Sequence, residues 1–299
     1  MIITRLIGGL GNQIFQYAVG RAVAARTNTP LLLDASGFPG YELRRYELDG
    51  FNVRAELVSA AQLARVGVTA SAPHSLLERI KLRFFSQSTQ KLPLREPILR
   101  EASFTYDTRI EYVQAPIYLD GYWQSERYFS AIRMQLLQEL TLKNEWGVGN
   151  EDMFAQIQAA GLGAVSLHVR RGDYVTNSHT ATYHGVCSLD YYRAAVAYIA
   201  ERVAAPHFFI FSDDHDWVST NLQTGFPTTF VSVNSADHGI YDMMLMKTCR
   251  HHVIANSSFS WWGAWLNPYQ DKIVVAPQRW FSGASHDISD LIPASWIRI

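Results

Sequence analysis

The chain has 299 residues, which at roughly 150 residues per domain corresponds to one large domain or two of moderate size. Hydrophobic residues make up 48% of it and charged residues 18%, so the composition excludes disordered and fibrous proteins. The 26 Lys and Arg residues against 27 Asp and Glu residues give a formal charge of -1, which excludes the broad basic surface that nucleic-acid binding normally requires. Any anion that binds must therefore meet a local cluster of positive charge.

The two cysteines, Cys187 and Cys249, are far apart in the sequence and form neither a zinc-binding pattern nor a disulfide framework. We expect both to be reduced and structural. The sequence begins with strand-like residues rather than a signal peptide, and no apolar run approaches the ~18 residues that span a bilayer. These observations predict a soluble, cytoplasmic protein.

Short apolar runs alternate with amphipathic segments along the whole chain. Strands are predicted at Ile2–Ile7, Leu31–Asp34, Ile117–Trp123, Ala164–Val169, His207–Ser212, Thr228–Val233, His252–Ala255 and Lys272–Ala276. Helices are predicted at Gln13–Arg26, Arg127–Leu142, Tyr191–Arg202 and Tyr241–Cys249. Strands that alternate with helices predict an α/β fold with parallel sheets, and continuous runs of Val, Ile, Leu and Phe are typical of strands covered on both faces.

A polar, glycine-containing connector at Lys143–Asn150 follows the predicted helix that ends near Leu142. We place a domain boundary there, giving an N-terminal domain of residues 1–147 and a C-terminal domain of residues 148–299. Two α/β domains of similar size, each with ligand loops at the carboxyl ends of its strands, predict a cleft between them. The short basic segment Leu76–Phe85 fits an ordinary surface helix better than a membrane-surface helix, and a peripheral membrane contact stays open.

A glycine-rich segment, Ile7–Tyr17 with the sequence IGGLGNQIFQY, joins the first predicted strand to the first predicted helix. Glycines at such a junction let backbone N–H groups approach an anion at the start of the helix. Asn12 and Gln13 add amide groups that suit a phosphate or a hydroxyl-rich ligand, although Asn is also a good helix cap. The alternative is a dinucleotide fingerprint with Asp34 as the ribose-binding acid, but Ile14 occupies the place of its third glycine.

Two adjacent arginines, Arg170 and Arg171, follow the buried-type strand Ala164–Val169. Such charges at the end of a strand are costly unless an anion lies there, and guanidinium groups bind phosphate oxygens bidentately. Side chains alternate along a strand, so His168 and Arg170 point to the same side. Asp173 is expected to orient an arginine or to act as a base. An ordinary surface cluster of arginine and aspartate is the alternative.

A run of acids, Asp213 and Asp214 before His215, ends another hydrophobic strand. Paired acids beside a histidine suit a divalent metal. One carboxylate would equally suit the N1–H and N2–H groups of a guanine. Capping of the next helix is the third interpretation, and the sequence leaves all three open.

Ser257 and Ser258 follow a predicted strand and begin a predicted helix. Their hydroxyl groups and the unpaired N–H groups of the helix start suit an anion, with helix capping as the alternative. Trp261, Trp262 and Trp265 share one face of that helix. We expect these tryptophans to pack against the sheet rather than to stack on a sugar.

These segments together resemble the motifs of glycosyltransferase family 11, the bacterial α1,2-fucosyltransferases. The match is carried by GGLGNQIFQYA at residues 8–18, GYWQSERYF at residues 121–129, HVRRGDY at residues 168–174 and ANSSFSWWGAWL at residues 255–266. It spans nearly the whole chain, and the joint occurrence in this order is highly specific. The resemblance implies a GT-B fold of two Rossmann-like domains facing each other across a cleft, with GDP-fucose in the C-terminal domain and the acceptor sugar mainly on the N-terminal side.

The resemblance also implies roles for individual residues. Arg170 looks like the arginine that grips the β-phosphate, with Arg171 as its structural or phosphate-binding neighbour. Asp173, the carboxylate nearest to this motif, is our candidate for the general base. The expected donor-binding residues are Asn12, Gln13, His168, Arg170, Arg171, Asp213, Asp214, Ser257 and Ser258.

The implied reaction moves L-fucose from GDP-β-L-fucose to the 2-hydroxyl of a terminal β-galactoside with inversion. Because Arg170 and the serines would stabilise the leaving diphosphate, we expect no metal ion and no separate cofactor. Glycans, O-antigen and free oligosaccharides with β1,3- or β1,4-linked galactose all fit as acceptors. Two other classes stay open: a dinucleotide-dependent oxidoreductase that uses the Gly8–Gly11 loop with Asp34, and a non-catalytic sugar-binding module.

Overall fold

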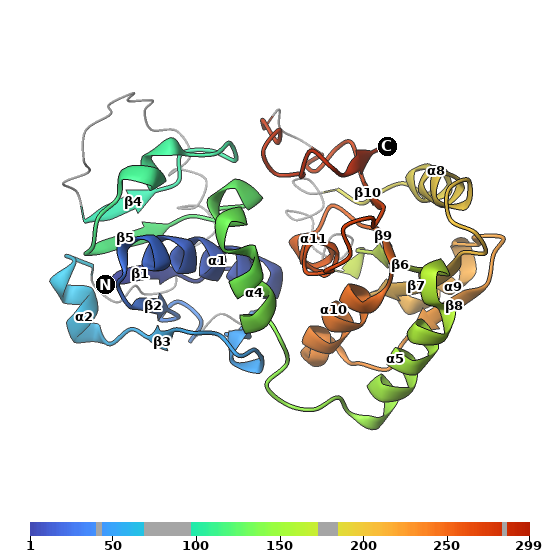
Figure 1. Ribbon diagram of the computed structural model, residues 1–299, viewed down its shortest axis with the longest axis horizontal. Coiled ribbons are helices and arrows are strands. Elements are labelled where there is room, and N and C mark those ends of the chain that lie inside the picture. Colours follow the sequence, from blue (N-terminus) through green and yellow to red (C-terminus); the bar gives the residue numbers. More distant parts are fainter. Residues whose placement is uncertain (40–43, 69–96, 173–184, 283–285) are drawn as a thin grey trace. The chain divides into compact units, whose positions relative to one another are not determined.

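The computed structural model describes residues 1–39, 44–68, 97–172, 185–282 and 286–299. The chain divides into two compact units (Figure 1). The N-terminal unit comprises Met1–Lys143 and His286–Leu291, and the C-terminal unit comprises Asn144–Ser285 and Ile292–Ile299. The main division thus falls inside the predicted connector, just before residue 147, but the return of a late segment to the N-terminal unit differs from the two continuous domains that we predicted.

Five parallel strands form the sheet of the N-terminal unit, in the order β3-β2-β1-β5-β4. The strands are β1 (Ile2–Arg5), β2 (Leu31–Asp34), β3 (Glu56–Leu57), β4 (Ile98–Arg100) and β5 (Ile117–Asp120). The α-helices are α1 (Leu10–Thr27), α2 (Ala60–Arg65) and α4 (Arg133–Glu139). Short 3-10 helices are η1 (Leu48–Gly50), η3 (Thr108–Tyr112), η4 (Glu126–Tyr128) and η5 (Ser130–Ile132).

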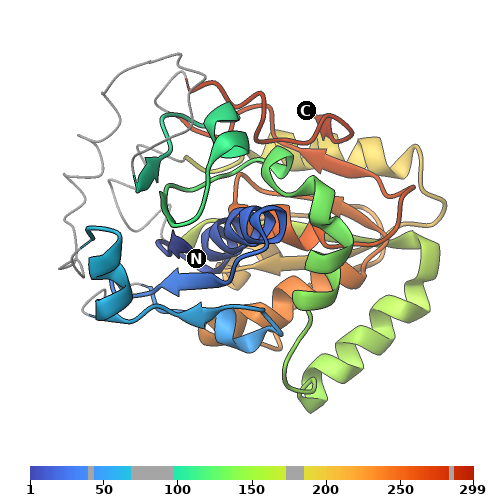
Figure 2. The same ribbon diagram turned by 60° about the vertical axis from the view of Figure 1, so that its left-hand side comes forward.

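Helix α1 is buried on most of its surface, because it packs against β1 and β2 of the sheet and also contacts the 3-10 helices η1 and η4. Both views show it alongside α4 (Figures 1 and 2). The Tyr17 hydroxyl donates to the carboxylate of Glu139 on α4, and the Arg21 guanidinium donates to the same carboxylate through Nε (3.0 Å) and Nη2 (2.9 Å). Glu139 is only 4% exposed, so this cluster is a buried charge pair that joins the first helix of the unit to its last.

The late segment His286–Leu291 is tied to the N-terminal unit by one carboxylate. Asp290 lies 2.7 Å from Nη1 of Arg127 and accepts from the backbone N–H of Tyr106 (2.8 Å). The ring of His286 also contacts that of Phe104. These contacts explain why the segment belongs to a unit whose other residues all precede residue 144.

Six parallel strands form the sheet of the C-terminal unit, in the order β11-β10-β9-β6-β7-β8. The strands are β6 (Ala164–Val169), β7 (His207–Ser212), β8 (Thr228–Val231), β9 (His251–Val253), β10 (Val274–Ala276) and β11 (Ile297–Arg298). The α-helices are α5 (Val148–Ala160), α8 (Leu189–Ala200), α9 (His215–Asn221), α10 (Gly239–Thr248) and α11 (Ser258–Trp265), with 3-10 helices η6 (Gly161–Gly163) and η7 (Ala236–His238).

Both faces of this sheet are covered. On one face Val165, Leu167 and Val169 of β6 pack with residues of α8 and α9. On the other face the core joins Ala164 of β6 to residues of β7, α5 and α10. Trp261, Trp262 and Trp265 of α11 are at most 2% exposed and lie against one another, which confirms that they pack in the core. No helix within the described ranges combines the length and the apolar character needed to cross a membrane.

The predicted strands are all present, but the predicted helix Arg127–Leu142 is wrong as a single element. The chain there forms η4 and η5 before α4 begins at Arg133. Phe129 between the two short helices has φ −141° and ψ 5° and is fully buried, with its ring 6.0 Å from that of Phe15. Burial of this ring against α1 thus breaks the helix. The short strands β3, β4 and β11 escaped prediction because two or three residues show no alternation.

Candidate active site

Polar residues gather at the carboxyl edge of the C-terminal sheet. In chain order β6, β7 and β8 run outward on one side, and β9, β10 and β11 run outward on the other, so the winding reverses between β6 and β9. Loops on the two sides of such a reversal diverge, and open α/β sheets bind ligands in the crevice that they leave. The segments that follow β6 and β9 carry the two arginines and the two serines singled out in the sequence.

Arg170 is anchored by a carboxylate from the neighbouring strand. Val169 and Ser212 pair at the ends of β6 and β7, so the next residues, Arg170 and Asp213, lie side by side. Nη1 of Arg170 is 3.0 Å from Oδ2 of Asp213, and the backbone N–H of Arg171 donates to Oδ1 (2.8 Å). The ion pair therefore fixes the guanidinium at the carboxyl edge.

The carboxyl group of Asp213 stays ionised. Burial alone would raise its pKa, but the guanidinium of Arg170 and the N–H groups of Arg171 and Gly172 outweigh burial and lower the pKa below its ordinary value. A Cβ atom on Gly172 would lie only 2.7 Å from Oδ2 of Asp213, so any side chain there would push the carboxylate away. Asp213 is thus a fixed counter-charge for Arg170.

The guanidinium group of Arg171 contacts two residues of the same unit. Its Nε donates to Oδ2 of Asp214 (3.1 Å), and its guanidinium carbon lies 3.9 Å from the ring centroid of Trp217. Oδ1 of Asp214 accepts from the backbone N–H of Trp217 and caps α9. Both oxygens of Asp213 and of Asp214 therefore have partners inside the protein. These contacts show that the two acids support the two arginines and the helix. Direct binding of guanine or of the donor by one of them stays a prediction.

His168 lies beneath the arginine on the same side of β6. Its side chain is 4% exposed, its ring lies 5.5 Å from that of Phe259 on α11, and Nδ1 has no hydrogen-bond partner within the described ranges. Burial is the main cause that lowers its pKa to about 4, with Arg170 lowering it further and Asp213 opposing. The imidazole is therefore neutral at physiological pH.

The turn before α11 is held rigidly. Oγ of Ser257 accepts from the backbone N–H of Phe259 (3.3 Å) and caps the helix, while Ser258 begins it and is half-buried. The side-chain amide of Asn256 donates to the carbonyl groups of Gly185 and Trp280 (3.2 Å each). The capping interpretation of Ser257 is thus confirmed, and the helix start stands in the segment that follows β9.

One acid near this edge was missed in the sequence. Asp242 lies in the first turn of α10, and its Oδ1 accepts from Nδ2 of Asn234 (2.7 Å), which is itself paired with Asn150. Burial raises the pKa of Asp242 to about 6. A Cβ atom at Gly239, where α10 begins, would lie 3.5 Å from the Phe259 ring that also contacts His168. An acid in the first turn of a helix is common, so the sequence carried no signal for it.

The glycine loop of the N-terminal unit is organised by amides. Nε2 of Gln13 donates to the carbonyl groups of Gly8 (3.0 Å) and Arg45 (2.7 Å), and its Oε1 accepts from the N–H of Glu47 (2.9 Å). Gln13 is fully buried and has no amide hydrogen left to donate. Its amide therefore holds the loop together, and a contact of Gln13 with the donor stays a prediction.

Asn12 connects two loops at the carboxyl edge of the N-terminal sheet. Its Oδ1 accepts from Nε2 of Gln124 (2.8 Å), which follows β5. Gln16 ties the same loops, because its Oε1 accepts from the N–H of Ile7 (2.9 Å) and its Nε2 donates to the carbonyl of Gly121 (3.2 Å). Asn12 is half-buried and does not cap α1, whose N-cap is Gly9.

Trp123 in the loop after β5 has an unusual backbone. Its φ is 56°, in the left-handed region that a bulky residue rarely adopts, and such strain costs about 1–3 kcal/mol. The carboxylate of Glu101 compensates: Oε2 accepts from the N–H of Tyr122 (2.7 Å) and Oε1 from the N–H of Trp123 (2.9 Å). Hydrogen bonds to a charged group contribute about 1.5–3 kcal/mol each, so Glu101 holds the strained turn.

The dinucleotide alternative does not fit the N-terminal unit. Asp34, its ribose-binding acid, is 3% exposed, and its carboxylate accepts from the hydroxyl of Tyr118 (2.6 Å) and the N–H of Ser36 (3.0 Å). Ile14 is fully buried in α1, where the fingerprint needs a glycine.

Two of the predicted features, Asp173 and the segment Leu76–Phe85, lie outside the described residues. Within the described ranges, no group of three or more His, Cys, Asp or Glu side chains is placed to hold a metal ion.

Comparison with known proteins agrees with this architecture. Residues 99–299 match the family model described as Glycosyl transferase family 11. An alpha-1,2-colitosyltransferase of Escherichia coli is 33% identical over 308 residues, covering 100% of this chain and 99% of the relative. A galactoside 2-alpha-L-fucosyltransferase of Bos taurus is 29% identical over 160 residues, covering 52% of this chain and 42% of the relative.

Among solved structures, a mutant of Arabidopsis thaliana FUT1 in complex with GDP matches with a TM-score of 0.50 and 12% identity, over 93% of this chain and 71% of that one. That likeness concerns the fold alone. Two Rossmann-like units with parallel sheets define an α/β protein of the GT-B type, as predicted. The chain belongs to glycosyltransferase family 11, and the oxidoreductase and the non-catalytic sugar-binding interpretations are wrong.

Proposed function

We propose that this glycosyltransferase moves L-fucose from GDP-β-L-fucose to the 2-hydroxyl of a terminal β-galactoside, with inversion at the anomeric carbon. The proposal is supported by the relatives, one named as an α-1,2-colitosyltransferase and one as a galactoside 2-α-L-fucosyltransferase. The observation that carries it is Arg170, which Asp213 holds at the carboxyl edge of β6. There it would meet the diphosphate of a nucleotide sugar in the crevice between β6 and β9.

Fucose transfer needs two kinds of help. Negative charge develops on the departing GDP, and the acceptor hydroxyl must lose a proton as it attacks the opposite face of an oxocarbenium-like carbon. Arg170 and the backbone N–H groups at the start of α11 would stabilise the leaving group. Since these donors already supply positive charge, we propose that the reaction needs no added metal ion.

GDP-colitose is a second candidate for the donor, because the full-length relative is named for that sugar. Colitose is L-fucose without its 3-hydroxyl. A site that hydrogen-bonds this hydroxyl would reject the deoxy sugar by as much as ~10⁴-fold. The deciding experiment measures GDP release from both donors, with lactose or N-acetyllactosamine as acceptor and EDTA present.

Acceptor-dependent release with a higher kcat/KM for GDP-fucose supports the proposal. A higher value for GDP-colitose replaces the donor and keeps the acceptor chemistry. If GDP protects the protein from thermal unfolding but neither donor is turned over with any galactoside, the proposed transfer is wrong.

Asp242 is our proposal for the acid that recognises guanine. Asp213 and Asp214 are occupied by arginines, whereas Asp242 is a half-buried carboxylate beside Asn234 with a pKa of about 6. Perturbed acids at the edge of a ligand crevice are candidates for function. A carboxylate there would accept from the N1–H and N2–H groups of the base.

This assignment predicts a pH dependence. The raised pKa means that Asp242 holds a proton below about pH 6 and then loses its charge as an acceptor, so GDP affinity should fall as the pH drops from 7 to 5. In Asp242→Asn, GDP should bind about 10–100-fold more weakly at pH 7, and the loss between pH 7 and 5 should be smaller than in wild type. Calorimetry checks both, with Asp216→Asn as the matched control in the first turn of α9. Equal GDP affinity in Asp242→Asn and wild type at pH 7 would refute the assignment.

Asp173 is our proposal for the general base, since it follows Gly172 directly in the sequence. A base that takes the acceptor proton contributes about 10²–10⁴-fold to the rate. Asp173→Asn should therefore lower kcat by such a factor and leave the GDP dissociation constant unchanged. Near-normal turnover in the variant removes Asp173 from this role.

A further inference from the structure

The loops after β1 and β5 lie at the same edge of the N-terminal sheet. In the order β3-β2-β1-β5-β4, the chain runs outward from β1 to β3, crosses to the far edge at β4 and returns to β5, which pairs in parallel with β1. The loops that follow β1 and β5, residues 6–9 and 121–124, therefore lie side by side at the carboxyl edge, where open α/β sheets bind ligands. A transferase binds two substrates, and the crevice of the C-terminal sheet already carries the residues proposed for the donor.

The two loops are connected into one rigid edge. The side-chain amide of Gln124 donates to Asn12 (2.8 Å), and that of Gln16 donates to the carbonyl of Gly121 (3.2 Å). Gly121 lies directly against Glu101, since a Cβ atom on this glycine would lie 2.4 Å from the Cβ of Glu101. Gln16 is fully buried and only ties the loops together, whereas the half-buried amide of Asn12 and the backbone groups of the two loops suit a hydroxyl-rich pyranoside.

Glu101 sets the conformation of the loop after β5. Its two carboxylate oxygens accept from consecutive N–H groups, those of Tyr122 and Trp123, and keep Trp123 at a φ of 56°. A strained backbone conformation of this kind persists only where the surrounding contacts hold it in place, and such conformations are concentrated in functional loops.

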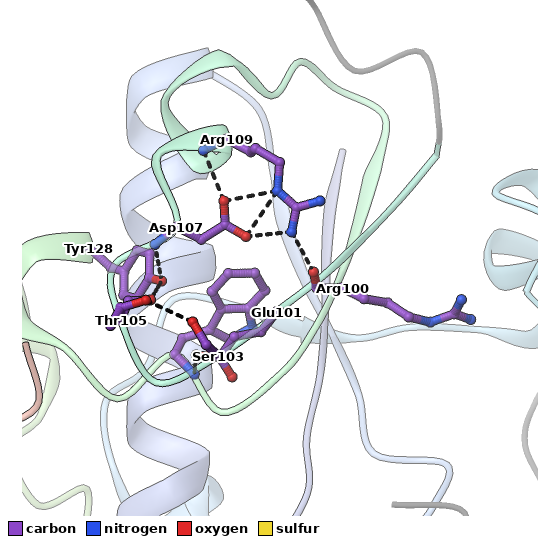
Figure 3. Close-up of polar contacts among 8 residues, drawn as sticks. Arg100, Glu101, Ser103, Thr105, Asp107, Arg109 and Tyr128 are labelled. Carbon is purple, nitrogen blue, oxygen red and sulfur yellow. Dashed lines mark hydrogen bonds and ion pairs between the residues drawn. The ribbon is translucent and has the colours of Figure 1, made fainter. Parts of the chain in front are cut away.

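The segment that begins with Glu101 after β4 is held by contacts among its neighbours (Figure 3). Arg109 donates to the carbonyl of Arg100 (2.9 Å) and is held by the carboxylate of Asp107. The N–H of Asp107 donates to the hydroxyl of Tyr128 (2.7 Å), whose ring packs edge-on against that of Trp123. These contacts hold the backbone at Arg100 and Asp107, on either side of Glu101 in the sequence.

We infer that Glu101 is a positioning residue for the acceptor: by holding the backbone of Tyr122 and Trp123, it shapes the loop on which the β-galactoside binds. This inference rests on the proposed function. Glu101 acts on the sugar only through the loop, so its loss should weaken acceptor use and leave the donor crevice of the other sheet intact.

The test is Glu101→Gln, which keeps the size of the side chain but turns an NH₂ group toward one of the two N–H groups. We expect the KM for the galactoside to rise about tenfold or more, with the KM for GDP-fucose within about twofold of wild type. Slow hydrolysis of GDP-fucose by water, measured without acceptor, should also be unchanged. Glu111→Gln is the matched control, since Glu111 is an exposed carboxylate of the same unit that accepts only from the Tyr106 hydroxyl among the contacts described here (2.9 Å), and it should behave as wild type.

An unchanged acceptor KM in Glu101→Gln overturns the inference, as does an equal loss of transfer and of hydrolysis. If the glutamine variant does not fold, Glu101→Asp gives the same readings, because its shorter carboxylate reaches only one of the two N–H groups. If the wild type turns over no donor, the proposed function fails separately. Binding of methyl β-galactoside, followed by saturation-transfer NMR, then decides: weaker binding to Glu101→Gln supports the inference, and equal or no binding to both proteins contradicts it.

Discussion

Arg170→Ala is expected to lower kcat for sugar transfer about 10²–10³-fold, the usual loss when one preorganised donor is removed from a developing negative charge. The variant also leaves Asp213 without its ion-pair partner, so negative charge would face the diphosphate where positive charge stood. We therefore expect GDP affinity to fall as well. Steady-state GDP release and calorimetry with GDP measure the two effects.

Arg170→Lys separates charge from shape. Lysine keeps the positive charge but lacks the planar fork that binds phosphate oxygens bidentately, so it should recover only part of the activity. Arg193→Ala is the matched control, because Arg193 pairs with Asp190 on the surface of the same unit. Should Arg170→Ala keep full turnover and GDP affinity, Arg170 is not the phosphate-binding residue.

Glu139→Ala is expected to destabilise the N-terminal unit by about 3–5 kcal/mol, the usual consequence of removing one partner of a buried charge pair. Glu139 accepts from both Arg21 and Tyr17, and burial together with this carboxylate already raises the pKa of Tyr17 well above its ordinary value. Without Glu139, the guanidinium and the hydroxyl would lose their main partner inside the unit.

Urea unfolding followed by circular dichroism measures this loss in free energy. The matched control is Glu201→Ala, which breaks the exposed pair of Glu201 with Arg202 and should cost less than about 1 kcal/mol. A loss of similar size in the two variants would show that the Glu139 cluster contributes no more than a surface pair.

The strands were predictable because both faces of the parallel sheets are buried. Such strands consist of continuous apolar residues, as in β7, and this pattern is typical of a strand covered on both sides. Alternation then placed His168 and Arg170 on one side, and the end of β6 marked Arg170 as a site residue. The predicted helix Arg127–Leu142 failed for a different reason. Burial of Phe129 against α1 is a tertiary contact, which the sequence pattern around Phe129 does not indicate.

Side-chain partners were the least predictable feature. Gln13, Asp213 and Asp214 are the residue types that bind phosphates, sugars and bases, but the same donors and acceptors also satisfy backbone groups and arginines. Only the folded chain shows that Gln13 bonds to Arg45 and Glu47, residues far along the sequence. Asp242 and Glu101 were missed for the converse reason, since the roles that we propose for them depend on the burial of one and on the loop contacts of the other.

The return of His286–Leu291 to the N-terminal unit has a consequence for how the chain reaches its final form. During synthesis, domains generally fold as units from the N-terminal end, but Asp290 of this unit is added only after almost all of the other unit has been synthesised. Strand β11, the edge of the second sheet, emerges later still. The half that is made first is therefore finished nearly last, and a cut at residue 143 yields a fragment that lacks its own closing segment.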